Sequence, residues 1–293
     1  MRRLGLLLAL VATPALAHVA ETHEAAPGWS FEPWVVLPLL ISALLFALGW
    51  RRLYARSSHG AGALKRRALL FGLGWLTLAG TVVSPLHEAG GQSFTAHMLE
   101  HELMMLAAAP LLVASEPLAV MLWAFPSGAR RPLGAASKSG WVAGPWKTLT
   151  DPIVATIAQA FALWVWHAPV LFDLALEHEG WHVAQHLSFL VSALLFWSAM
   201  LHRRAGKGLA AGCLFATSIV GGALGAFMAF SESPWYAPYA ALGLAPFGLT
   251  PAEDQQMAGL LMWIPGGMVH ALFALALIGT MLRAQPREAL DAR

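Results

Sequence analysis

A short apolar segment and seven longer ones, separated by polar stretches, make up most of the 293-residue chain. The short segment follows two arginines near the amino terminus and ends in Ala15-Leu16-Ala17. This is the arrangement of a secretory signal peptide, in which the small-x-small triplet is the cleavage site. We therefore expect residues 1–17 to be removed and residues 18–32 to form a periplasmic tail that begins with His18.

The seven longer segments each approach the roughly 20 residues that a helix needs to cross the hydrocarbon layer of a membrane. They cover residues 33–50, 64–84, 94–113, 152–172, 181–201, 208–230 and 256–282. The pattern predicts an all-α polytopic membrane helix bundle of about seven transmembrane helices over residues 33–282, followed by a tail over residues 283–293. Prolines flank a further apolar piece, Pro117–Phe125, which is predicted to be an interfacial or broken extension rather than another span.

Composition and charge agree with a membrane protein and indicate its orientation. Hydrophobic residues make up 58% of the chain and charged residues only 12%, which excludes an ordinary cytosolic enzyme. All 18 Lys and Arg residues lie in the signal peptide or in the loops and tail on one side of the predicted bundle. Because basic residues mark the cytoplasmic side, we expect a bacterial inner-membrane protein with a periplasmic mature amino terminus and a cytoplasmic carboxyl terminus. The connection Pro126–Thr150 is expected to be a flexible loop, and the expected surroundings are the lipid bilayer and no nucleic acid.

Two pairs of histidines with the same spacing lie within the spans. His97 and His101 are four residues apart in the third span, and His182 and His186 are four apart at the start of the fifth. A spacing of four puts both side chains on one face of a helix, and the rise of about 1.5 Å per residue puts the two pairs at similar depth. Ionisable residues in a membrane are costly and usually functional, so we expect the four imidazoles to converge on one metal ion near the periplasmic face.

Further donors near the four histidines bear on which metal is bound. Met104 and Met105 continue the third span inward, although methionine is also a common core residue. Imidazole suits zinc, copper and iron, and added thioethers shift the preference to cuprous copper, Cu(I). His167, before Pro169 at the end of the fourth span, is a candidate fifth ligand or hydrogen-bond partner of a ligand. Asp254, near the start of the seventh span, is placed to orient imidazoles or to cap its helix.

Other interpretations of the histidines stay open from the sequence alone. The segment His178-Glu179-Gly180-Trp181-His182 matches the H-E-x-x-H signature of zinc metalloproteases, but its glycine favours a turn or cap over the continuous helix that the signature needs. One alternative is a membrane-embedded zinc-dependent hydrolase with Glu179 or Glu100 as the base. Another is a haem-binding electron-transfer protein in which two histidines ligate iron. His270, deep in the seventh span, is expected to bond to a neighbouring helix.

Four motifs in the chain resemble the CtaG family of cytochrome c oxidase assembly factors. Two of them contain the histidine pairs, and all four occur in the family's order: His97-Met-Leu-Glu-His101, Trp166-His-Ala-Pro-Val-Leu-Phe-Asp173, His182-x-x-x-His186 and Asp254-Gln-Gln-Met-Ala-Gly-Leu-Leu-Met-Trp263. The resemblance covers most of the chain from the second or third span to the seventh. Glu100 and Glu102 depart from the family pattern, because they put two carboxylates beside the first histidine pair.

The resemblance implies a role in the maturation of a haem–copper oxidase. It implies delivery of copper from the periplasmic side to the copper B centre of oxidase subunit I, with a periplasmic copper chaperone as a further expected partner. We accordingly expect a non-enzymatic metallochaperone, with zinc as the alternative metal. Carried over to matching positions, the functional residues are His97, His101, His167, His182, His186 and Asp254.

Overall fold

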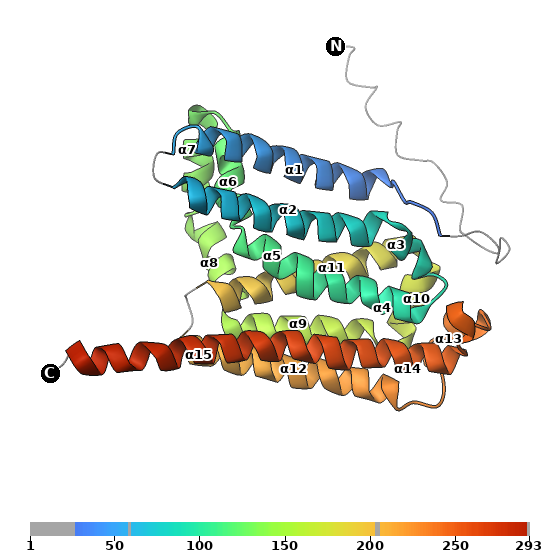
Figure 1. Cartoon of the computed structure of the whole chain (residues 1–293). Coiled ribbons are helices and arrows are strands. Elements are labelled where there is room, and N and C mark those ends of the chain that lie inside the picture. Colours follow the sequence, from blue (N-terminus) through green and yellow to red (C-terminus); the bar gives the residue numbers. More distant parts are fainter. Residues whose placement is uncertain (1–26, 58–59, 203–205, 292–293) are drawn as a thin grey trace, which may run out of the picture.

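The computed structural model of the chain describes residues 27–57, 60–202 and 206–291. All the named secondary-structure elements in these residues are helices. Within this part of the chain, seven long helical segments lie side by side along a common axis (Figure 1). They are α1 (Pro33–Tyr54), α2 (Ala61–Val83), the segment from α4 (Phe94–Glu102) to α5 (Ala109–Ala114), α9 (Pro152–Trp166), α11 (Glu179–Leu201), α12 (Lys207–Ala229), and the segment from α14 (Pro251–Leu261) to α15 (Gly267–Asp291). Each overlaps one predicted apolar segment, so the all-α bundle is confirmed. The expected signal peptide lies outside the described residues.

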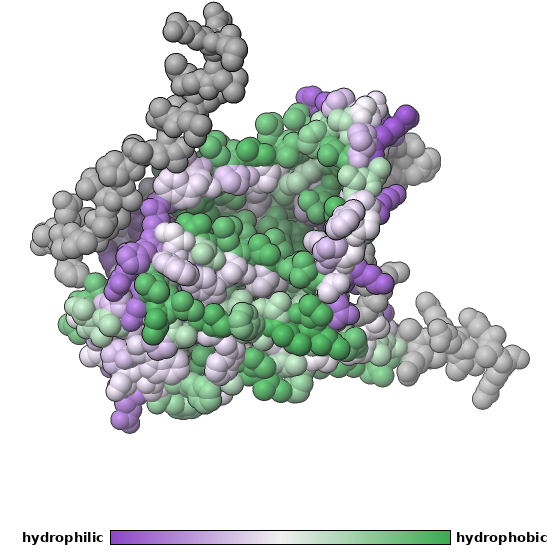
Figure 2. Space-filling view, turned by 180° about the vertical axis from the view of Figure 1, so that it is seen from behind, coloured by the Kyte–Doolittle hydropathy of each residue, from purple (hydrophilic) through white to green (hydrophobic). Residues whose placement is uncertain are grey.

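Four of these segments are long and apolar enough by themselves to cross a membrane, namely α1, α11, α12 and the stretch Pro251–Arg283. If each of two bent helix pairs counts as one span, the described residues provide six. α2 is outside this set, and its first two turns carry three basic residues. Figure 2 shows hydrophobic residues over much of the middle of one face and hydrophilic residues toward the two ends. The chain is a multi-pass helical membrane protein, and the total of seven spans stays a prediction.

Two of the long segments change from α-helix to π-helix partway along. Their parts are α4 (Phe94–Glu102), η1 (Leu103–Ala108) and α5 (Ala109–Ala114), then α14 (Pro251–Leu261), η4 (Met262–Gly266) and α15 (Gly267–Asp291). In η1 the Met105 carbonyl accepts a hydrogen bond from the Trp197 indole N–H at 2.9 Å, and η4 contains Pro265, which has no N–H to donate. The expected bond from His270 to a neighbouring helix is wrong, because its Nδ1 lies 2.8 Å from the Gly266 carbonyl of its own segment.

Prolines break the chain at two positions that the sequence indicated. α6 (Pro117–Met121) and the 3-10 turn η2 (Leu122–Ala124) are bent by 49° from the preceding segment and form the predicted broken extension. α9 ends at Trp166, and α10 (Pro169–Glu177) begins with proline, which fits the first turn of a helix but not its interior. The fourth span is therefore shorter at its C-terminal end than the predicted segment 152–172.

The connection between the third and fourth spans is helical, so the prediction of a flexible loop is wrong there. It contains α7 (Ser127–Ala136) and α8 (Gly140–Leu149). The Arg130 guanidinium lies 3.8 Å above the ring of Trp123, which ties α7 to η2. α8 meets α9 at 69° and carries Trp141, which is 93% exposed, as is typical of tryptophan at a membrane interface. Contacts of this kind stabilise short helices without leaving a long apolar pattern in the sequence.

The closest helix packing relevant to the site joins α12 to α14. At Gly225 an added Cβ would lie 2.7 Å from the Gly259 carbonyl oxygen, and at Gly259 it would lie 2.5 Å from that of Gly225. Small residues at such positions let membrane helices pack backbone against backbone. α14 in turn contacts α4, so this packing determines where the start of α14 meets the start of α4.

Candidate metal centre

Five histidines converge at one end of the bundle, where the short helices α3 (Pro85–Ala89) and α13 (Ala237–Ala241) also lie (Figure 1). α4 provides His97 and His101, α11 provides His182 and His186, and α3 provides His87. We call these five residues the histidine cluster. The two predicted pairs therefore meet in space, and α3 adds an imidazole that the spacing of the pairs did not indicate.

Two groups of three histidines within the cluster each place ring nitrogens within 4.8 Å of one another. The first group is His87, His182 and His186, and the second is His97, His101 and His186. His186 belongs to both groups, and its ring centroid lies 4.3 Å from that of His182 and 4.9 Å from that of His101. Imidazoles this close together are able to share one ion.

A carboxylate from another helix holds the start of α4. The Asp254 side chain, on α14, accepts a hydrogen bond from the Phe94 amide at 2.6 Å and another from the Ser93 hydroxyl at 2.9 Å. It accepts a third from the Thr95 amide at 3.2 Å. A helix start leaves its first amides without intrahelical partners, so these bonds stabilise α4 one turn before its first histidine.

Asp254 therefore caps a neighbouring helix, and the expectation that it caps its own helix is wrong. α14 has a separate capping box, in which Thr250 and Glu253 each accept a bond from the other's backbone amide. Both oxygens of Asp254 bond to residues 93–95 of the chain. Any effect of Asp254 on the histidines is thus exerted through the position of α4.

A tyrosine determines which nitrogen of His97 carries the hydrogen. The Tyr239 hydroxyl, on α13, donates to the Gly90 carbonyl at 2.6 Å and lies 3.1 Å from Nδ1 of His97. Because the hydroxyl hydrogen goes to Gly90, its oxygen accepts the hydrogen of Nδ1, which leaves a lone pair on Nε2 for a metal ion. Burial and the negative charges of Asp254 and Glu100 raise the pKa of Tyr239 well above its ordinary value, so the hydroxyl keeps its hydrogen.

A buried carboxylate lies between two members of the cluster. Glu100 is 0% exposed, and its Oε1 lies 2.8 Å from Nδ1 of His87 and 3.7 Å from Nδ1 of His186. Burial lowers the pKa of His87, but the hydrogen bond to Glu100 and the charges of Glu100, Glu32 and Glu88 outweigh burial, so the pKa is raised. A carboxylate on one nitrogen of an imidazole commonly directs the other nitrogen to a metal.

Ring nitrogens of four cluster histidines are buried and have no hydrogen-bond partner within the described part of the chain. They are Nε2 of His97, His182 and His186 and both nitrogens of His101. Each unpaired buried polar atom costs roughly 1–3 kcal/mol, so a protein keeps several together mainly where a ligand satisfies them. The donor set fits a copper or zinc ion, both of which imidazole binds.

Of the other expected ligands, His167 lies beside the cluster. Its ring centroid lies 6.0 Å from that of Phe189, which His101 also contacts. Its Nδ1 lies 2.6 Å from the Leu163 carbonyl, and its Nε2 is buried without a hydrogen-bond partner among the described residues. Met104 is buried in the main hydrophobic core, and Met105 lines a separate cavity within the bundle. η1 begins directly after α4, so both methionines stand on a π-helical segment rather than on the α-helix that carries His97 and His101.

The H-E-x-x-H match does not form one continuous helix. α11 begins at Glu179, and His178 is its exposed, non-helical N-cap residue. Gly180 lies in the first turn of α11 rather than at a cap, contrary to expectation. His178 belongs to neither group of close histidines among the described residues, so the match does not bring its two histidines to one site.

Helical spacing alone did not indicate His87 or Tyr239 as site residues. His87 stands in a helix of five residues that ends before α4 begins, so no shared helical face links it to His97. The local signal for an ordered His87 is the start of α3, where Ser84 caps the helix and Pro85 occupies its first position. Tyr239 is 142 residues from its partner along the chain, beyond the reach of any local pattern.

The chain is similar to known proteins over most of its length. The model of a family described as cytochrome c oxidase caa3 assembly factor matches residues 44–284. Uncharacterized proteins of Mycobacterium bovis and Mycobacterium tuberculosis are each 26% identical to it over 181 residues. That similarity covers 59% of this chain and 26% of each relative, so the chain spans only a minor part of the curated relatives it matches. No solved structure matches the chain.

Proposed function

Because the chain belongs to the family of cytochrome c oxidase caa3 assembly factors, we propose that it binds copper through the histidine cluster and helps to insert it into the copper B centre of the oxidase. The observation that carries this proposal is the set of buried ring nitrogens without hydrogen-bond partners among the described residues. Hydrogen bonds that His97 and His87 donate to Tyr239 and Glu100 orient these imidazoles without the ion, which suits an ion that arrives and leaves.

The donor chemistry supports copper as the cargo. The single cysteine, Cys213, is buried in the main hydrophobic core on α12, so the cluster relies on imidazole nitrogens beside one carboxylate. Imidazole suits both copper and zinc, and among the divalent metals of the first row Cu(II) binds nitrogen sites most tightly. Copper as Cu(I) is the proposed cargo, and zinc is the alternative that metal analysis must exclude.

Charge supports delivery on the periplasmic side. At the end of the bundle opposite the cluster, Arg52 donates to a backbone carbonyl of η2, and Arg67 forms an ion pair with Glu116. The cluster end carries acidic residues instead, including Glu88 and Glu179. Basic residues favour the cytoplasmic side, so the cluster faces the periplasm, where a copper chaperone is the proposed donor and oxidase subunit I the proposed acceptor.

Transfer of an ion requires that its ligands be replaced one at a time. His97 and His101 are buried, whereas His87 and His182 are only half-buried. The cluster therefore has a more accessible side, formed by α3 and α11. Ligands of a partner protein would exchange first with the imidazoles on that side.

A zinc-dependent hydrolase is the second candidate, and one observation favours it. Glu100 stands between His97 and His101 in an H-x-x-E-H arrangement, which also occurs in zinc peptidases. The glutamate would serve as base for a metal-bound water. A base must reach both water and substrate, whereas the Glu100 carboxylate is fully buried and bonded to His87. Loss of a hydrolytic activity in Glu100→Gln, with zinc still bound, would support the hydrolase over the metallochaperone.

Metal analysis of the full-length protein in detergent tests copper binding. The protein is loaded anaerobically with Cu(I), freed of excess ion and compared with a variant in which the four histidines of α4 and α11 are replaced by alanine. We expect the variant to lose the copper that the wild type retains at the cluster. The matched control replaces the exposed His178 and His202 by alanine and is expected to behave like the wild type. Undiminished copper in the four-histidine variant would contradict the proposal.

Insertion into the oxidase is tested in cells that lack the protein and are complemented with the wild type or the four-histidine variant. The oxidase purified from each strain is analysed for copper and haem. We expect the variant strain to yield an oxidase that contains haem but is deficient in copper B. A fully copper-loaded oxidase in that strain would refute the insertion step, even if the purified wild-type protein binds copper.

A further inference from the structure

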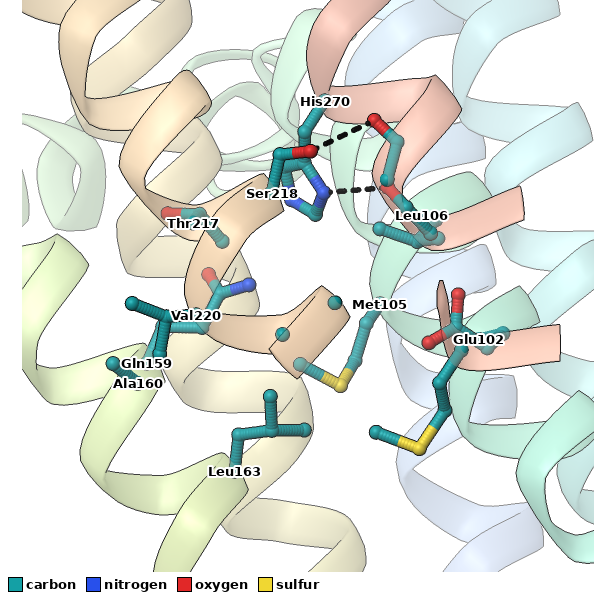
Figure 3. Close-up of a pocket in the computed structure, with 15 residues that line it drawn as sticks. Glu102, Met105, Leu106, Gln159, Ala160, Leu163, Thr217, Ser218, Val220 and His270 are labelled. Atoms are coloured by element: carbon teal, nitrogen blue, oxygen red, sulfur yellow. Dashed lines mark hydrogen bonds between the residues drawn. The ribbon is translucent and has the colours of Figure 1, made fainter. Parts of the chain in front are cut away.

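A small cavity with a mostly apolar lining lies inside the bundle, and no histidine of the cluster lines it. It has a volume of about 40 Å³ and is bounded by α4, η1, α9, α12, η4 and α15 (Figure 3). Its polar lining residues are Glu102, Gln159, Thr217, Ser218 and His270. A cavity of this size has room for an ion or for a few water molecules.

Three of the lining side chains present an unpaired acceptor. Oε2 of Glu102, Oε1 of Gln159 and Nε2 of His270 are buried and have no hydrogen-bond partner among the described residues. The two hydroxyl groups of the lining cannot serve them, because Thr217 and Ser218 donate to backbone carbonyls at 2.9 Å and 3.2 Å. The side chains of Gln159 and His270 are nearly inaccessible, at 3% and 6% exposure of the whole residue.

The hydrogen bond made by Nδ1 of His270 determines that Nε2 carries a free lone pair. Nδ1 lies 2.8 Å from the Gly266 carbonyl, which can only accept a hydrogen bond, so Nδ1 carries the hydrogen. Nε2 then has a free lone pair at the cavity, which is the form in which imidazole binds a metal.

The carboxylate of Glu102 approaches the cavity between α4 and η4. An added Cβ at Gly266 would lie 3.0 Å from Oε2 of Glu102, so the glycine leaves space for the carboxylate. Unpaired carboxylate, amide and imidazole groups are costly in a membrane and usually mark a functional site. Each of the three groups offers an electron pair to a cation bound in the cavity.

Two thioethers in the lining narrow the choice of cation. Met105, in η1, and Met262, in η4, border the same cavity. Thioether and imidazole together favour Cu(I), whereas magnesium and calcium prefer sites made of oxygen ligands. Both methionines stand on π-helical segments, which are frequent at functional sites.

We propose that this cavity is a second copper site, which takes Cu(I) through His270, Met105 and Glu102. The proposal rests on the proposed function and extends it, because one helical segment leads from the cluster to the cavity. His97 and His101 lie on α4, and Met105 follows in η1 of the same segment. The cavity thus borders the continuation of the segment that carries the first histidine pair.

Copper stoichiometry of the full-length protein, loaded anaerobically with Cu(I) in detergent, tests the second site. The wild type is expected to bind two copper ions per chain, and Met105→Leu, which nearly conserves volume, and His270→Asn are expected to bind one. Met200→Leu and His202→Asn are the matched controls, since Met200 is buried away from the cavity lining and His202 is exposed; both should bind two. X-ray absorption should show a copper–sulfur contribution that Met105→Leu weakens.

The four-histidine variant separates this proposal from the proposed function. If it loses one copper ion and retains a second with the sulfur contribution, both proposals are supported. A single copper ion that Met105→Leu and His270→Asn leave unchanged would overturn the inner site alone. If the four-histidine variant retains all of its copper but His270→Asn loses copper, copper binding at the cluster is refuted and the inner site is supported. If His270→Asn does not fold, the volume-conserving Met105→Leu decides.

Discussion

The hydroxyl of Tyr239 lies 3.1 Å from Nδ1 of His97, so a residue on α13 sets the tautomer of a histidine on α4. We expect Tyr239→Phe to lower the copper affinity of the cluster by about 10- to 100-fold, because such partners orient metal-binding imidazoles. The buried Nδ1–H and the Gly90 carbonyl also lose their partner, at a cost of about 1–3 kcal/mol in the free energy of unfolding. Competition for Cu(I) with a coloured chelator measures the affinity.

Tyr236→Phe is the matched control for this substitution. The Tyr236 hydroxyl donates at 3.1 Å to the backbone carbonyl of His167 and not to a cluster imidazole. We expect a similar loss of stability with unchanged copper affinity. An equal loss of affinity in the two variants would show that packing, rather than the tautomer of His97, is what the tyrosine provides.

His186 belongs to both groups of close histidines, whereas His87 belongs to one. We expect His186→Ala to weaken copper binding by at least about 100-fold, which is about 2.8 kcal/mol, because either set of ligands loses a member. His87→Ala is expected to weaken binding less, since the group of His97, His101 and His186 stays complete. The same competition titration compares the two variants, and a larger effect of His87→Ala would contradict a central role for His186.

Asp254 accepts three hydrogen bonds at the start of α4. We expect Asp254→Ala to lower the free energy of unfolding by about 2 kcal/mol, because two backbone amides and a hydroxyl lose a buried acceptor. Copper per chain should stay unchanged well below the unfolding temperature. Glu253→Ala, which removes only the Glu253 half of the exposed capping box and leaves Thr250 as the cap of α14, should destabilise the protein less than Asp254→Ala. Thermal unfolding in detergent measures the stability of both variants. If Asp254→Ala loses copper without losing stability, Asp254 is a metal ligand rather than a helix cap.

The contact between α12 and α14 has no room for a side chain. We expect Gly259→Ala to cost about 1–3 kcal/mol, because its Cβ would meet the Gly225 carbonyl oxygen at 2.5 Å and the helices must separate. Gly212→Ala, on α12, has nothing within 4 Å of the added Cβ and is expected to be neutral or to stabilise by up to about 1 kcal/mol. Circular dichroism during heating compares the variants, and equal stability would contradict the close packing.

Copper is expected to stabilise the folded protein. An ion that binds only the folded state adds about 2.7 kcal/mol to the free energy of unfolding at a concentration of 100 times Kd. Cu(I) should therefore raise the Tm of the wild type, and a strong chelator should reverse the shift. The four-histidine variant should keep only the part of the shift that the inner site provides, and a full shift in that variant would count against the cluster.

Local pattern was enough to predict the long helices and four of the five histidines of the cluster. The apolar segments are close to the thickness of a membrane, and a helix satisfies its own backbone, so segment length alone indicates where helices form. The two histidine pairs were predictable from the sequence because residues four apart lie on the same face of a helix. α7 and α8 escaped prediction because short helices at an interface depend on contacts such as that of Arg130 with Trp123.

The sequence by itself determined the all-α membrane bundle, the positions of its long helices and the faces that carry His97, His101, His182 and His186. The tertiary structure alone decided that His87 and Glu100 meet, that Tyr239 orients His97 and that Asp254 caps α4. It also decided that Glu102, Gln159 and His270 line one cavity. Helical periodicity encodes which side chains share a face, but contacts between distant segments depend on how helices pack, and that depends on the whole bundle at once.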